Sequence, residues 1–360
     1  MTNNLSVDSE FLRRFLDSNF PSVSPGINIL VKSNNFEFEY WNGSIKELGF
    51  NYSRNTIYDL ASLTKPIVTA TLAMKLVENG VLSLEDSLGS IGLYPQEMLI
   101  SKITVRDLLS HRSGLKSVYP GYNFGKNRED YLKAISLVYG DSNVNIREEY
   151  SDLNYILVGF LLEQITGDSL SDLANKLIFS PLNMRSTGFN PEQNSPNIAP
   201  TELDYNRGGL IWGKVHDELS YYLGGIAGNA GLFSNISDLA KYVEAILSYH
   251  ILEKATLKKM ISPENEKNGG IFSLGWMTRV KNKPLQTNEI EYSSFMGDLA
   301  PIGSFGHTGF TGTSLCIDYE ARTYVIILSN RVYPSRSNPS IFSFRKRFHN
   351  LVFSLLSSSD

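Results

Sequence analysis

Strand-like sequence occurs near both ends of this chain, with mainly helical sequence between them. Near the N-terminus, two short runs rich in β-branched and aromatic residues flank Ser33-Asn34-Asn35, which is typical of a β-hairpin. The runs with strand pattern are Ile27–Lys32, Phe36–Trp41, Phe272–Val280, Gly306–Asp318 and Thr323–Ser329, with a turn expected at Asp318–Arg322. Because strands satisfy their backbone groups by pairing, we expect one sheet built from both ends of the chain, with the helical part inserted between them.

Three helices in the middle of the chain are predicted from apolar spacing and, for two of them, from a glycine at the C-terminus. The expected ranges are Pro66–Asn79 before Gly80, Leu153–Thr166 before Gly167, and Ser237–Ser248. A further helix is expected near the C-terminus, with Pro339 at its start. The basic run Arg345-Lys346-Arg347 lies in that helix, and we expect it on the solvated face rather than in a binding patch.

The composition is that of a globular protein and argues against several classes of function. Hydrophobic residues make up 42% of the 360 residues, charged residues 19%, and the net charge is -4, so nucleic acid is not an expected partner. The longest apolar run, Tyr155–Leu162, is too short to cross a membrane. The first residues lack the features of a secretory signal, so we expect a cytoplasmic protein with no membrane partner. The single cysteine, Cys316, is expected to be a buried structural thiol.

Ser62 and Lys65 form the first candidate catalytic pair. Residues three apart on a helix share a face, so Ser62-Leu63-Thr64-Lys65 places an amine beside a hydroxyl. Pro66 is tolerated only in the first turn of a helix, which places Ser62 at a helix N-terminus, where the helix dipole stabilises negative charge. Taken alone the pattern is common, and an N-cap serine followed by a solvated lysine is the simpler explanation.

Several further segments follow one another along nearly the whole chain. They are Leu60–Pro66, Val105–Leu115, Tyr150-Ser151-Asp152, Pro181–Met184, Gly228–Ser234 and Gly306–Gly312. With these segments the sequence resembles the serine β-lactamase and penicillin-binding-protein superfamily. The resemblance is to its class C-like branch of β-lactamases, D-stereospecific peptidases, carboxylesterases and cell-wall amidases. So many ordered segments make chance similarity a poor explanation.

The resemblance implies an α+β fold of the β-lactamase/transpeptidase type, with an antiparallel sheet flanked by helices and an inserted, mainly helical domain. Together with the strands at both ends of the chain, it predicts a sheet domain from residues 1–60 and 268–360. The helical domain is expected at residues 61–267. The active site is expected in the cleft between the two domains, with Ser62 at their junction.

The resemblance also implies catalytic roles for named residues. Ser62 corresponds to the nucleophile, Lys65 to the amine that activates it, and Tyr150 to a phenol that exchanges protons with nucleophile and leaving group. The backbone N–H groups of Ser62 and Phe310 correspond to the oxyanion hole, and Gly309 lets substrate approach the strand edge. A tyrosine ionises at about pH 10, so it acts as a base at neutral pH only beside a cation such as Lys65. Whether Lys65 or Tyr150 is the general base stays open.

Asp152 and His307 depart from the pattern of the relatives that bind penicillins. Those relatives have an asparagine in place of Asp152, and its amide donates a hydrogen bond to the acyl side chain of the substrate. An ionised carboxylate only accepts, so Asp152 is expected to pair with Lys65 instead. The relatives have a lysine in place of His307 to hold the substrate carboxylate, whereas a histidine is mostly neutral at neutral pH. Both changes favour esters and neutral amides over penicillins and D-alanyl-D-alanine termini.

The segment His216-Asp217-Glu218, followed by Gly224-Gly225, resembles a signature of a sub-branch with cell-wall-recycling amidases and carboxypeptidases. In that sub-branch a histidine is expected at the position of Asn229, so the match is incomplete. His216 is therefore either a pocket residue or a loop histidine. The substrate-binding residues expected from the resemblance are Asp152, His216, His307, Thr308 and Gly309.

The leading hypothesis is a serine hydrolase that cleaves ester or amide bonds through a Ser62 acyl-enzyme, like the carboxylesterase-like or amidase-like members of the superfamily. The expected substrate is a small-molecule ester, an amide or a short peptide. No cofactor or metal is implied, and the oligomeric state is open. One alternative is a D-alanyl-D-alanine carboxypeptidase or β-lactamase, and another is a catalytically idle ligand-binding relative. Intact Ser62, Lys65 and Tyr150 make the idle relative the least favoured.

Overall fold

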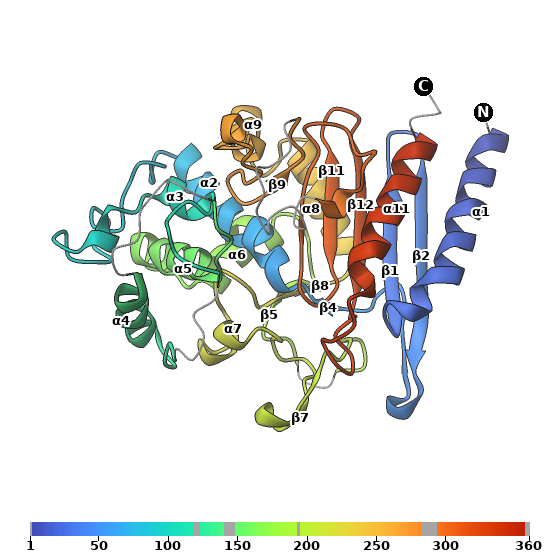
Figure 1. Cartoon of the computed structure of the whole chain (residues 1–360), viewed down its shortest axis with the longest axis horizontal. Coiled ribbons are helices and arrows are strands. Elements are labelled where there is room, and N and C mark those ends of the chain that lie inside the picture. The colour runs from blue at the N-terminus through green and yellow to red at the C-terminus, as the bar shows by residue number, and fades with distance from the viewer. Residues whose placement is uncertain (1, 118–122, 140–147, 193–194, 282–293, 357–360) are drawn as a thin grey trace.

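The computed structural model describes residues 2–117, 123–139, 148–192, 195–281 and 294–356, and a seven-stranded antiparallel sheet forms the centre of this part of the chain (Figure 1). In order across the sheet, the strands are β3 (Phe50–Asn51), β2 (Glu37–Ile45), β1 (Gly26–Lys32), β12 (Thr323–Ser329), β11 (Ser314–Asp318), β10 (Phe305–Thr308) and β9 (Met277–Thr278). The two ends of the chain meet where β1 pairs with β12. Both ends therefore build one sheet, as the strand pattern predicted.

Side chains of the central strands alternate between the two faces of this sheet. Ile27 and Ile29 of β1 belong to the apolar core on one face, whereas Leu30 belongs to the core on the other face. Ile327 of β12 lies opposite Ile29 in the register of the two strands and shares its core. Because both faces are buried, β12 is apolar over most of its length instead of alternating with polar residues.

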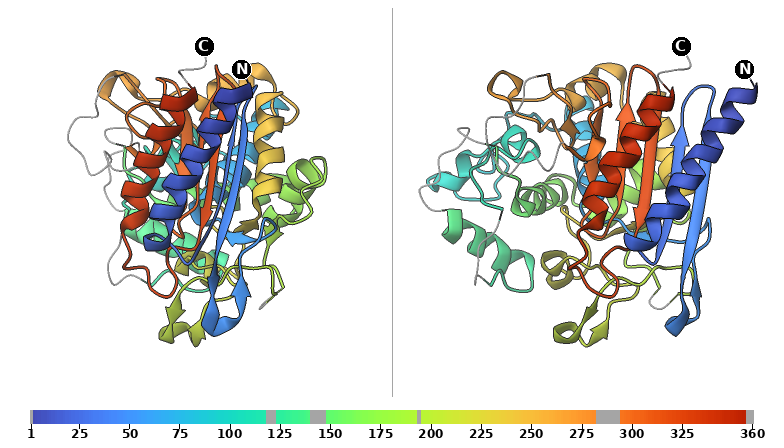
Figure 2. Two further views of the ribbon diagram at one scale, coloured as in Figure 1. Left: turned by 90° about the vertical axis from the view of Figure 1, so that its right-hand side faces the viewer. Right: turned by 45° about the vertical axis from the view of Figure 1, so that its right-hand side comes forward.

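Two long helices cover one face of the sheet. Helix α1 (Thr2–Asn19) and helix α11 (Ser340–Leu356) come from opposite ends of the chain. They lie side by side on the sheet and run roughly along its strands (Figure 2). Leu16 of α1 and Phe348 of α11 are fully buried in the core between helices and sheet. The N- and C-terminal helices therefore complete the layer that the terminal strands begin.

The opposite face of the sheet is covered by the helical part of the chain. Helix α8 (Ile236–Leu247) packs directly on β1 and β12. The other helices in the described part are α2 (Thr71–Glu78), α3 (Val105–Leu109), α4 (Arg128–Tyr139), α5 (Asp152–Thr166), α6 (Leu170–Ala174), α7 (Glu218–Tyr222) and α9 (Lys254–Ile261). Short strand pairs link them, formed by β4 (Tyr58–Asp59), β8 (Leu232–Ser234) and β5 (Gly188–Phe189), and by β6 (Leu203–Asp204) and β7 (Gly209–Leu210).

Most elements expected from the sequence are confirmed. The hairpin of β1 and β2, the turn before β12 and the helix that follows Pro339 are present. Gly80 and Gly167 end their helices with φ values of 70° and 75°. Glycine adopts this left-handed conformation without steric cost, which is why its place in the sequence marked the helix ends. Cys316 is fully buried, as expected.

Two of the three strand predictions for the second half of the chain were too long, whereas Thr323–Ser329 matches β12 in full. The run Gly306–Asp318 forms two strands, β10 and β11, because Gly312 takes a φ of 118° in the turn between them. Within Phe272–Val280, only β9 is a strand, and Phe272 bridges back to Met277 around Gly275, whose φ is 107°. Helix α1 was not predicted.

Arg345 was wrongly expected on the solvated face of the C-terminal helix. Its side chain is only 2% exposed, and its guanidinium donates to the carbonyl oxygens of Gly309 and Thr313, at 3.2 and 2.6 Å. Arg345 follows Phe344 on the inward face of α11, so it points at the turn between β10 and β11. By donating hydrogen bonds to these buried carbonyl groups, the guanidinium stabilises that turn.

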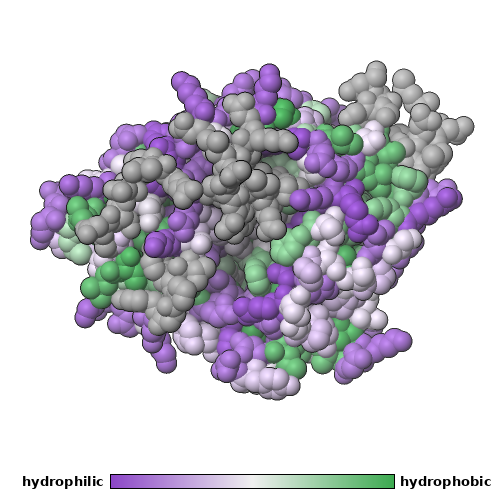
Figure 3. All heavy atoms as spheres, viewed as in Figure 1, coloured by the Kyte–Doolittle hydropathy of each residue, from purple (hydrophilic) through white to green (hydrophobic). Residues whose placement is uncertain are grey.

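The division into a sheet domain and an inserted helical domain stays a prediction, although α8, from the helical part, packs on the sheet. In the described part of the chain, no helix is both long and apolar enough to cross a membrane, and the cytoplasmic location stays a prediction as well. Figure 3 shows hydrophilic side chains over most of the described surface on one face, with apolar side chains in small separate groups.

Replacing Leu16 by alanine is expected to lower the free energy of unfolding by about 2 to 5 kcal/mol, because it empties a fully buried position between α1 and the sheet. Urea-induced unfolding followed by circular dichroism measures the change. Leu137→Ala on α4 is the matched control, since that side chain is 65% exposed, and it should change stability by less than about 0.5 kcal/mol. Equal stability of the two variants would contradict the docking of α1.

Candidate active site

Ser62 lies in a tight turn that directly follows β4. The turn, Ala61–Leu63, is a single turn of 3-10 helix, and Ala61 has a φ of 48°, a left-handed conformation that is unusual for alanine. A carboxylate oxygen of Asp59 accepts a hydrogen bond from the Ala61 N–H at 2.8 Å and helps to hold this conformation. Backbone strain of this kind concentrates at functional sites, and here it immediately precedes the serine.

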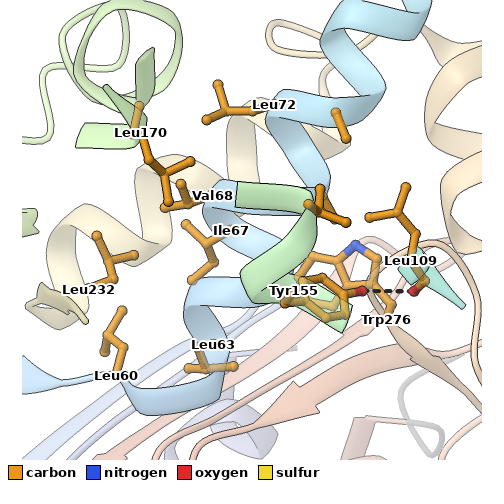
Figure 4. Packing of buried hydrophobic residues seen from close by; sticks show 14 of the residues in the cluster. Leu60, Leu63, Ile67, Val68, Leu72, Leu109, Tyr155, Leu170, Leu232 and Trp276 are labelled. Atoms are coloured by element: carbon orange, nitrogen blue, oxygen red, sulfur yellow. Dashed lines mark hydrogen bonds between the residues drawn. The ribbon is translucent and has the colours of Figure 1, made fainter. Parts of the chain in front are cut away.

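Lys65 begins the helix that follows the turn. Residues Lys65–Ala70 form one π-helical turn, with Pro66 near its start, and the helix continues as α2. All six residues are buried, and Leu63, Ile67 and Val68 pack in the core beside Tyr155 of α5 (Figure 4). Single π-helical turns within α-helices are frequent at functional sites. Dense packing on this helix leaves Lys65 little freedom of position.

The ammonium group of Lys65 contacts three acceptors. Its Nζ lies 3.0 Å from Ser62 Oγ, 2.6 Å from Asp152 Oδ1 and 3.0 Å from the Asn229 carbonyl oxygen. The Lys65 side chain is 0% exposed, so a solvated lysine behind an N-cap serine is the wrong explanation of this sequence. The predicted pairing of Asp152 with Lys65 is confirmed.

The Tyr150 ring lies beside Lys65, and the His111 ring packs against the Tyr150 ring. The Tyr150 ring centroid lies 5.0 Å from Lys65 Nζ, and the His111 ring lies 4.5 Å from the Tyr150 ring. His111 Nδ1 accepts a hydrogen bond from the Ser151 N–H at 3.1 Å. Burial and the charge of Lys65 lower the pKa of His111 well below its usual range, so this histidine is neutral. His111 was not predicted as a site residue, although the segment Val105–Leu115 contains it.

The turn after β10 is attached to the turn that carries the serine. Thr313 Oγ1 donates to the Leu60 carbonyl at 3.0 Å, and Thr311 Oγ1 donates to the Asp59 carbonyl at 2.7 Å. A Cβ atom on Gly309 would lie 2.4 Å from the Leu60 carbonyl oxygen, so only glycine fits there. These contacts place the segment after Gly309 beside the nucleophile turn.

Phe310 follows Gly309 and is half exposed. Among the described residues, no acceptor is recorded for the backbone N–H groups of Phe310 and Ser62. Arg331 holds the Phe310 carbonyl through a hydrogen bond from Nε at 2.9 Å, and its guanidinium lies 4.6 Å from the Phe310 ring centroid. Phe310 is therefore fixed at its carbonyl and ring while its N–H keeps its donor capacity.

His307 is buried in β10, and its ring centroid lies 6.0 Å from that of Tyr150. Its Nδ1 lies 2.8 Å from the carbonyl oxygen of the partly buried Thr308, and because a carbonyl only accepts, Nδ1 carries the proton. Burial, reinforced by the charge of Lys65, lowers the pKa of His307 to about 3. His307 is thus neutral at neutral pH, as the sequence comparison with lysine-bearing relatives predicted.

His216 lies behind Phe310 rather than next to Ser62. Its ring stacks on the Phe310 ring at a centroid distance of 5.6 Å, and its Nε2 lies 2.9 Å from a carboxylate oxygen of Glu202. Its backbone N–H donates to Asp59 at 2.6 Å. With a side chain 3% exposed, His216 is placed to support Phe310, and direct contact with substrate stays a prediction.

Asp217 and Asn229 complete the surroundings of Lys65, and neither was predicted as a site residue. Asp217 Oδ1 accepts a hydrogen bond from Asn229 Nδ2 at 3.0 Å, which orients the segment whose carbonyl holds Lys65. Burial and the nearby charge of Asp152 raise the pKa of Asp217. Asn229 contacts Lys65 through its backbone, so that contact does not require the histidine expected from the sub-branch signature.

Comparison with known proteins identifies the family of this chain. The sequence profile of the beta-lactamase family matches residues 27–346. The chain belongs to the beta-lactamase family. It is therefore a serine hydrolase, and the predicted superfamily and α+β fold are confirmed.

One relative of this beta-lactamase family member is a protein from Escherichia coli named putative D-alanyl-D-alanine carboxypeptidase. The two are 30% identical over 373 residues, which cover 91% of this chain and 83% of the relative. A penicillin-binding protein homologue from Pyrococcus abyssi superposes with a TM-score of 0.70 at 23% identity, covering 94% of this chain and 75% of that chain. A D-amino acid amidase from Ochrobactrum anthropi superposes with a TM-score of 0.71 at 19% identity, covering 97% and 98%. At these identities the two structures establish the fold alone.

The described residues contain no group of three or more histidine, cysteine, aspartate or glutamate side chains arranged to hold a metal ion. The polar groups around Ser62 instead form one connected set of hydrogen bonds. Lys65 is its centre, Asp152 and the Asn229 carbonyl are its acceptors, and Asp217 supports it from behind.

Buried His307 is expected to make the protein sensitive to acid. Its native pKa of about 3 lies below the value of about 6.5 in an unfolded chain, so between these values only the unfolded chain binds the proton. The stability is full above pH 6.5 and falls as the pH drops through this window. His307→Gln, which does not titrate, should lose about 2 kcal/mol less stability than the wild type between pH 7 and pH 5.

Urea midpoints at the two pH values measure this difference. His250→Gln is the matched control, because His250 is exposed on the surface, and it should lose as much stability as the wild type. Equal losses for His307→Gln and the wild type would show that native His307 takes up its proton in the same pH range as in the unfolded chain.

Proposed function

We propose that this serine hydrolase cleaves small esters or neutral amides through an acyl-enzyme on Ser62. The observation that carries the proposal is the 3.0 Å contact between Ser62 Oγ and the Nζ of the fully buried Lys65. A serine hydroxyl is a weak nucleophile until a neighbouring base removes its proton, and a buried amine at hydrogen-bond distance is suited to that task. In the proposed reaction, Ser62 Oγ attacks the carbonyl carbon of the substrate.

The acceptors around Lys65 direct its proton chemistry toward Ser62. Asp152 in its ionised form and the Asn229 carbonyl can only accept, so each takes one N–H of Lys65 in either protonation state of the amine. The third position on Nζ faces Ser62 Oγ. A neutral amine therefore presents its lone pair to the serine hydroxyl, and an ammonium presents a proton that can return to the oxygen.

Tyr150 is the second group placed to move a proton. Its ring lies beside Lys65 Nζ, and a nearby cation stabilises a phenolate. In our proposal Tyr150 and Lys65 together take the proton from Ser62 and pass it to the leaving alcohol or amine. Water then attacks the acyl-enzyme and gives a proton to the same groups. The bond between the acyl carbon and Ser62 Oγ breaks, the groups return the proton to Oγ, and the acid is released. Which of the two groups is the general base stays open.

The N–H groups of Ser62 and Phe310 are proposed as the oxyanion hole. Two backbone donors without an acceptor in the described part of the chain, joined through contacts at Leu60 and Gly309, are suited to the negative oxygen of a tetrahedral intermediate. Removing one donor of such a pair typically costs about 2.7 to 4 kcal/mol of transition-state stabilisation. The contacts of Arg331 and His216 with Phe310 would keep this donor in place.

The electrostatics of the site disfavour substrates that depend on binding a carboxylate. His307 is neutral and buried at the position where penicillin-binding relatives hold the substrate carboxylate with a lysine. Asp152 adds a carboxylate at the position where they have an amide donor. A substrate carboxylate would therefore meet no cation at His307, and an acyl side chain would meet an acceptor instead of a donor at Asp152.

A D-alanyl-D-alanine carboxypeptidase is the second candidate. It is favoured by the names of relatives that are 30% identical over most of both chains. A catalytically idle relative is the least supported, because Ser62 and Lys65 lie within hydrogen-bond distance and Tyr150 lies beside them.

Ser62→Ala is expected to reduce the hydrolysis of p-nitrophenyl butyrate at least a thousandfold, because the acyl-enzyme cannot form. Release of p-nitrophenol measures the rate, and mass spectrometry after a fluorophosphonate probe should find the adduct on Ser62 of the wild type alone. Ser248→Ala, at an exposed serine, is the control and should keep full activity. Unchanged turnover in Ser62→Ala would remove Ser62 as the nucleophile.

Release of D-alanine from a short peptide ending in D-alanyl-D-alanine is expected to have a kcat/KM at least about tenfold below that for the butyrate ester. The reason is the missing charge-assisted hydrogen bond to the terminal carboxylate, which is worth about 1.5 to 3 kcal/mol. Chromatographic detection of free D-alanine measures it. A higher kcat/KM for the peptide than for the ester would make the second candidate the function.

A further inference from the structure

We infer that the site selects acyl groups that carry a protonated amine on the carbon next to the scissile carbonyl, and that Asp152 binds this amine. The inference rests on the proposed function, since it concerns the acyl group that Ser62 accepts. It names the substrate class as esters or amides of amino acids with a free α-amine. Asp152 would thereby be a specificity-determining residue as well as a partner of Lys65.

One oxygen of the Asp152 carboxylate, Oδ2, is available to a substrate. Asp152 is the first residue of α5, where the positive end of the helix dipole favours an ionised carboxylate. Its Oδ1 accepts from Lys65, whereas for Oδ2 no partner is recorded among the described residues. The Asp152 side chain is 30% exposed and the Lys65 side chain 0%, so the carboxylate is the solvent-facing half of the pair.

Asp152 and Ser62 are linked through one nitrogen atom. Lys65 Nζ lies 3.0 Å from Ser62 Oγ and 2.6 Å from Asp152 Oδ1, so the carboxylate and the serine hydroxyl both contact the same ammonium group. In an acyl-enzyme, an α-amine is three bonds from Oγ, which is about 3 to 4 Å by standard bond lengths. An amine of that reach is suited to contact the Asp152 carboxylate.

The charges around Asp152 also favour a substrate cation. Asp152 and Asp217 are close enough for each charge to affect the other, and Lys65 pairs with Asp152. His111 and His307 are neutral at neutral pH. The guanidinium of Arg345 is directed at backbone carbonyls of the β10–β11 turn. A substrate ammonium therefore supplies a second cation to the Asp152 carboxylate.

Asp152 Oδ2 can bind only a hydrogen-bond donor, because a carboxylate accepts and cannot donate. An ammonium offers three donors and forms a charge-assisted bond, which is stronger than a bond from a neutral group. An asparagine side chain has the same shape as Asp152 without the charge, which makes Asp152→Asn the matched variant.

The test compares two esters of the same shape, alanine methyl ester and methyl isobutyrate, in which an ammonium is replaced by a methyl group. Methanol release is followed by nuclear magnetic resonance at a pH where the amine is protonated, with both D- and L-alanine esters. The readout is the ratio of the two kcat/KM values within each enzyme. General damage to Lys65 chemistry in Asp152→Asn cancels in this ratio. The higher intrinsic reactivity of the amino ester cancels when the ratios of the two enzymes are compared.

The wild type is expected to prefer one alanine ester at least tenfold, and Asp152→Asn to lower this ratio at least tenfold. If both esters are hydrolysed in a Ser62-dependent manner and the ratio is the same in Asp152→Asn, the inference is overturned and the proposed function stands. If the wild type hydrolyses neither these esters nor p-nitrophenyl butyrate, the proposed function itself fails.

A second measurement needs no variant. (1-Aminoethyl)boronic acid and isopropylboronic acid have the same shape and both add to a serine hydroxyl, so each mimics the tetrahedral intermediate on Ser62. The amino compound is expected to inhibit butyrate hydrolysis with an inhibition constant at least tenfold lower. Equal constants would overturn the binding of the amine by Asp152, even where Asp152→Asn fails to fold.

Discussion

The burial of the Lys65 ammonium is the constraint on which the rest of the site depends. A charge without solvent must be surrounded by acceptors, because leaving it unpaired costs several kcal/mol. Its acceptors come from three separate segments, namely the nucleophile turn at Ser62, the start of α5 at Asp152 and the loop at Asn229. Satisfying one buried charge therefore brings these three segments together, and the same contacts create a serine with an amine beside it.

The sheet takes part in this arrangement through the turn after β10. Thr311 and Thr313 hold the backbone just before Ser62, and Gly309 allows the close approach. Arg345 reaches the same turn from α11, a helix at the far end of the chain. The turn that carries Phe310 is thus held both by α11 and by the backbone before Ser62. We propose that these contacts position the Phe310 N–H as a donor for the oxyanion.

Two residues near Lys65 carry the proposal on specificity. His307 is uncharged because it is buried, and Asp152 offers an acceptor where penicillin-binding relatives have a donor. In our proposal both residues determine which substrate groups can bind, while Ser62, Lys65 and Tyr150 carry out the reaction. Specificity and chemistry would then depend on different side chains of the same site.

The sequence by itself determined the elements that depend on local chemistry and on characteristic segments. The strands at both ends and the helix ends at Gly80 and Gly167 could be predicted because local residue patterns specify them. The family and the partnership of Asp152 with Lys65 could be predicted from the resemblance of characteristic segments. Only the tertiary structure placed His111 against Tyr150, Asp217 behind Lys65, and Arg345 beneath the Gly309 turn. These contacts join residues far apart in the chain, and whether an arginine or an aspartate is solvated or buried is decided by packing, which no local pattern records.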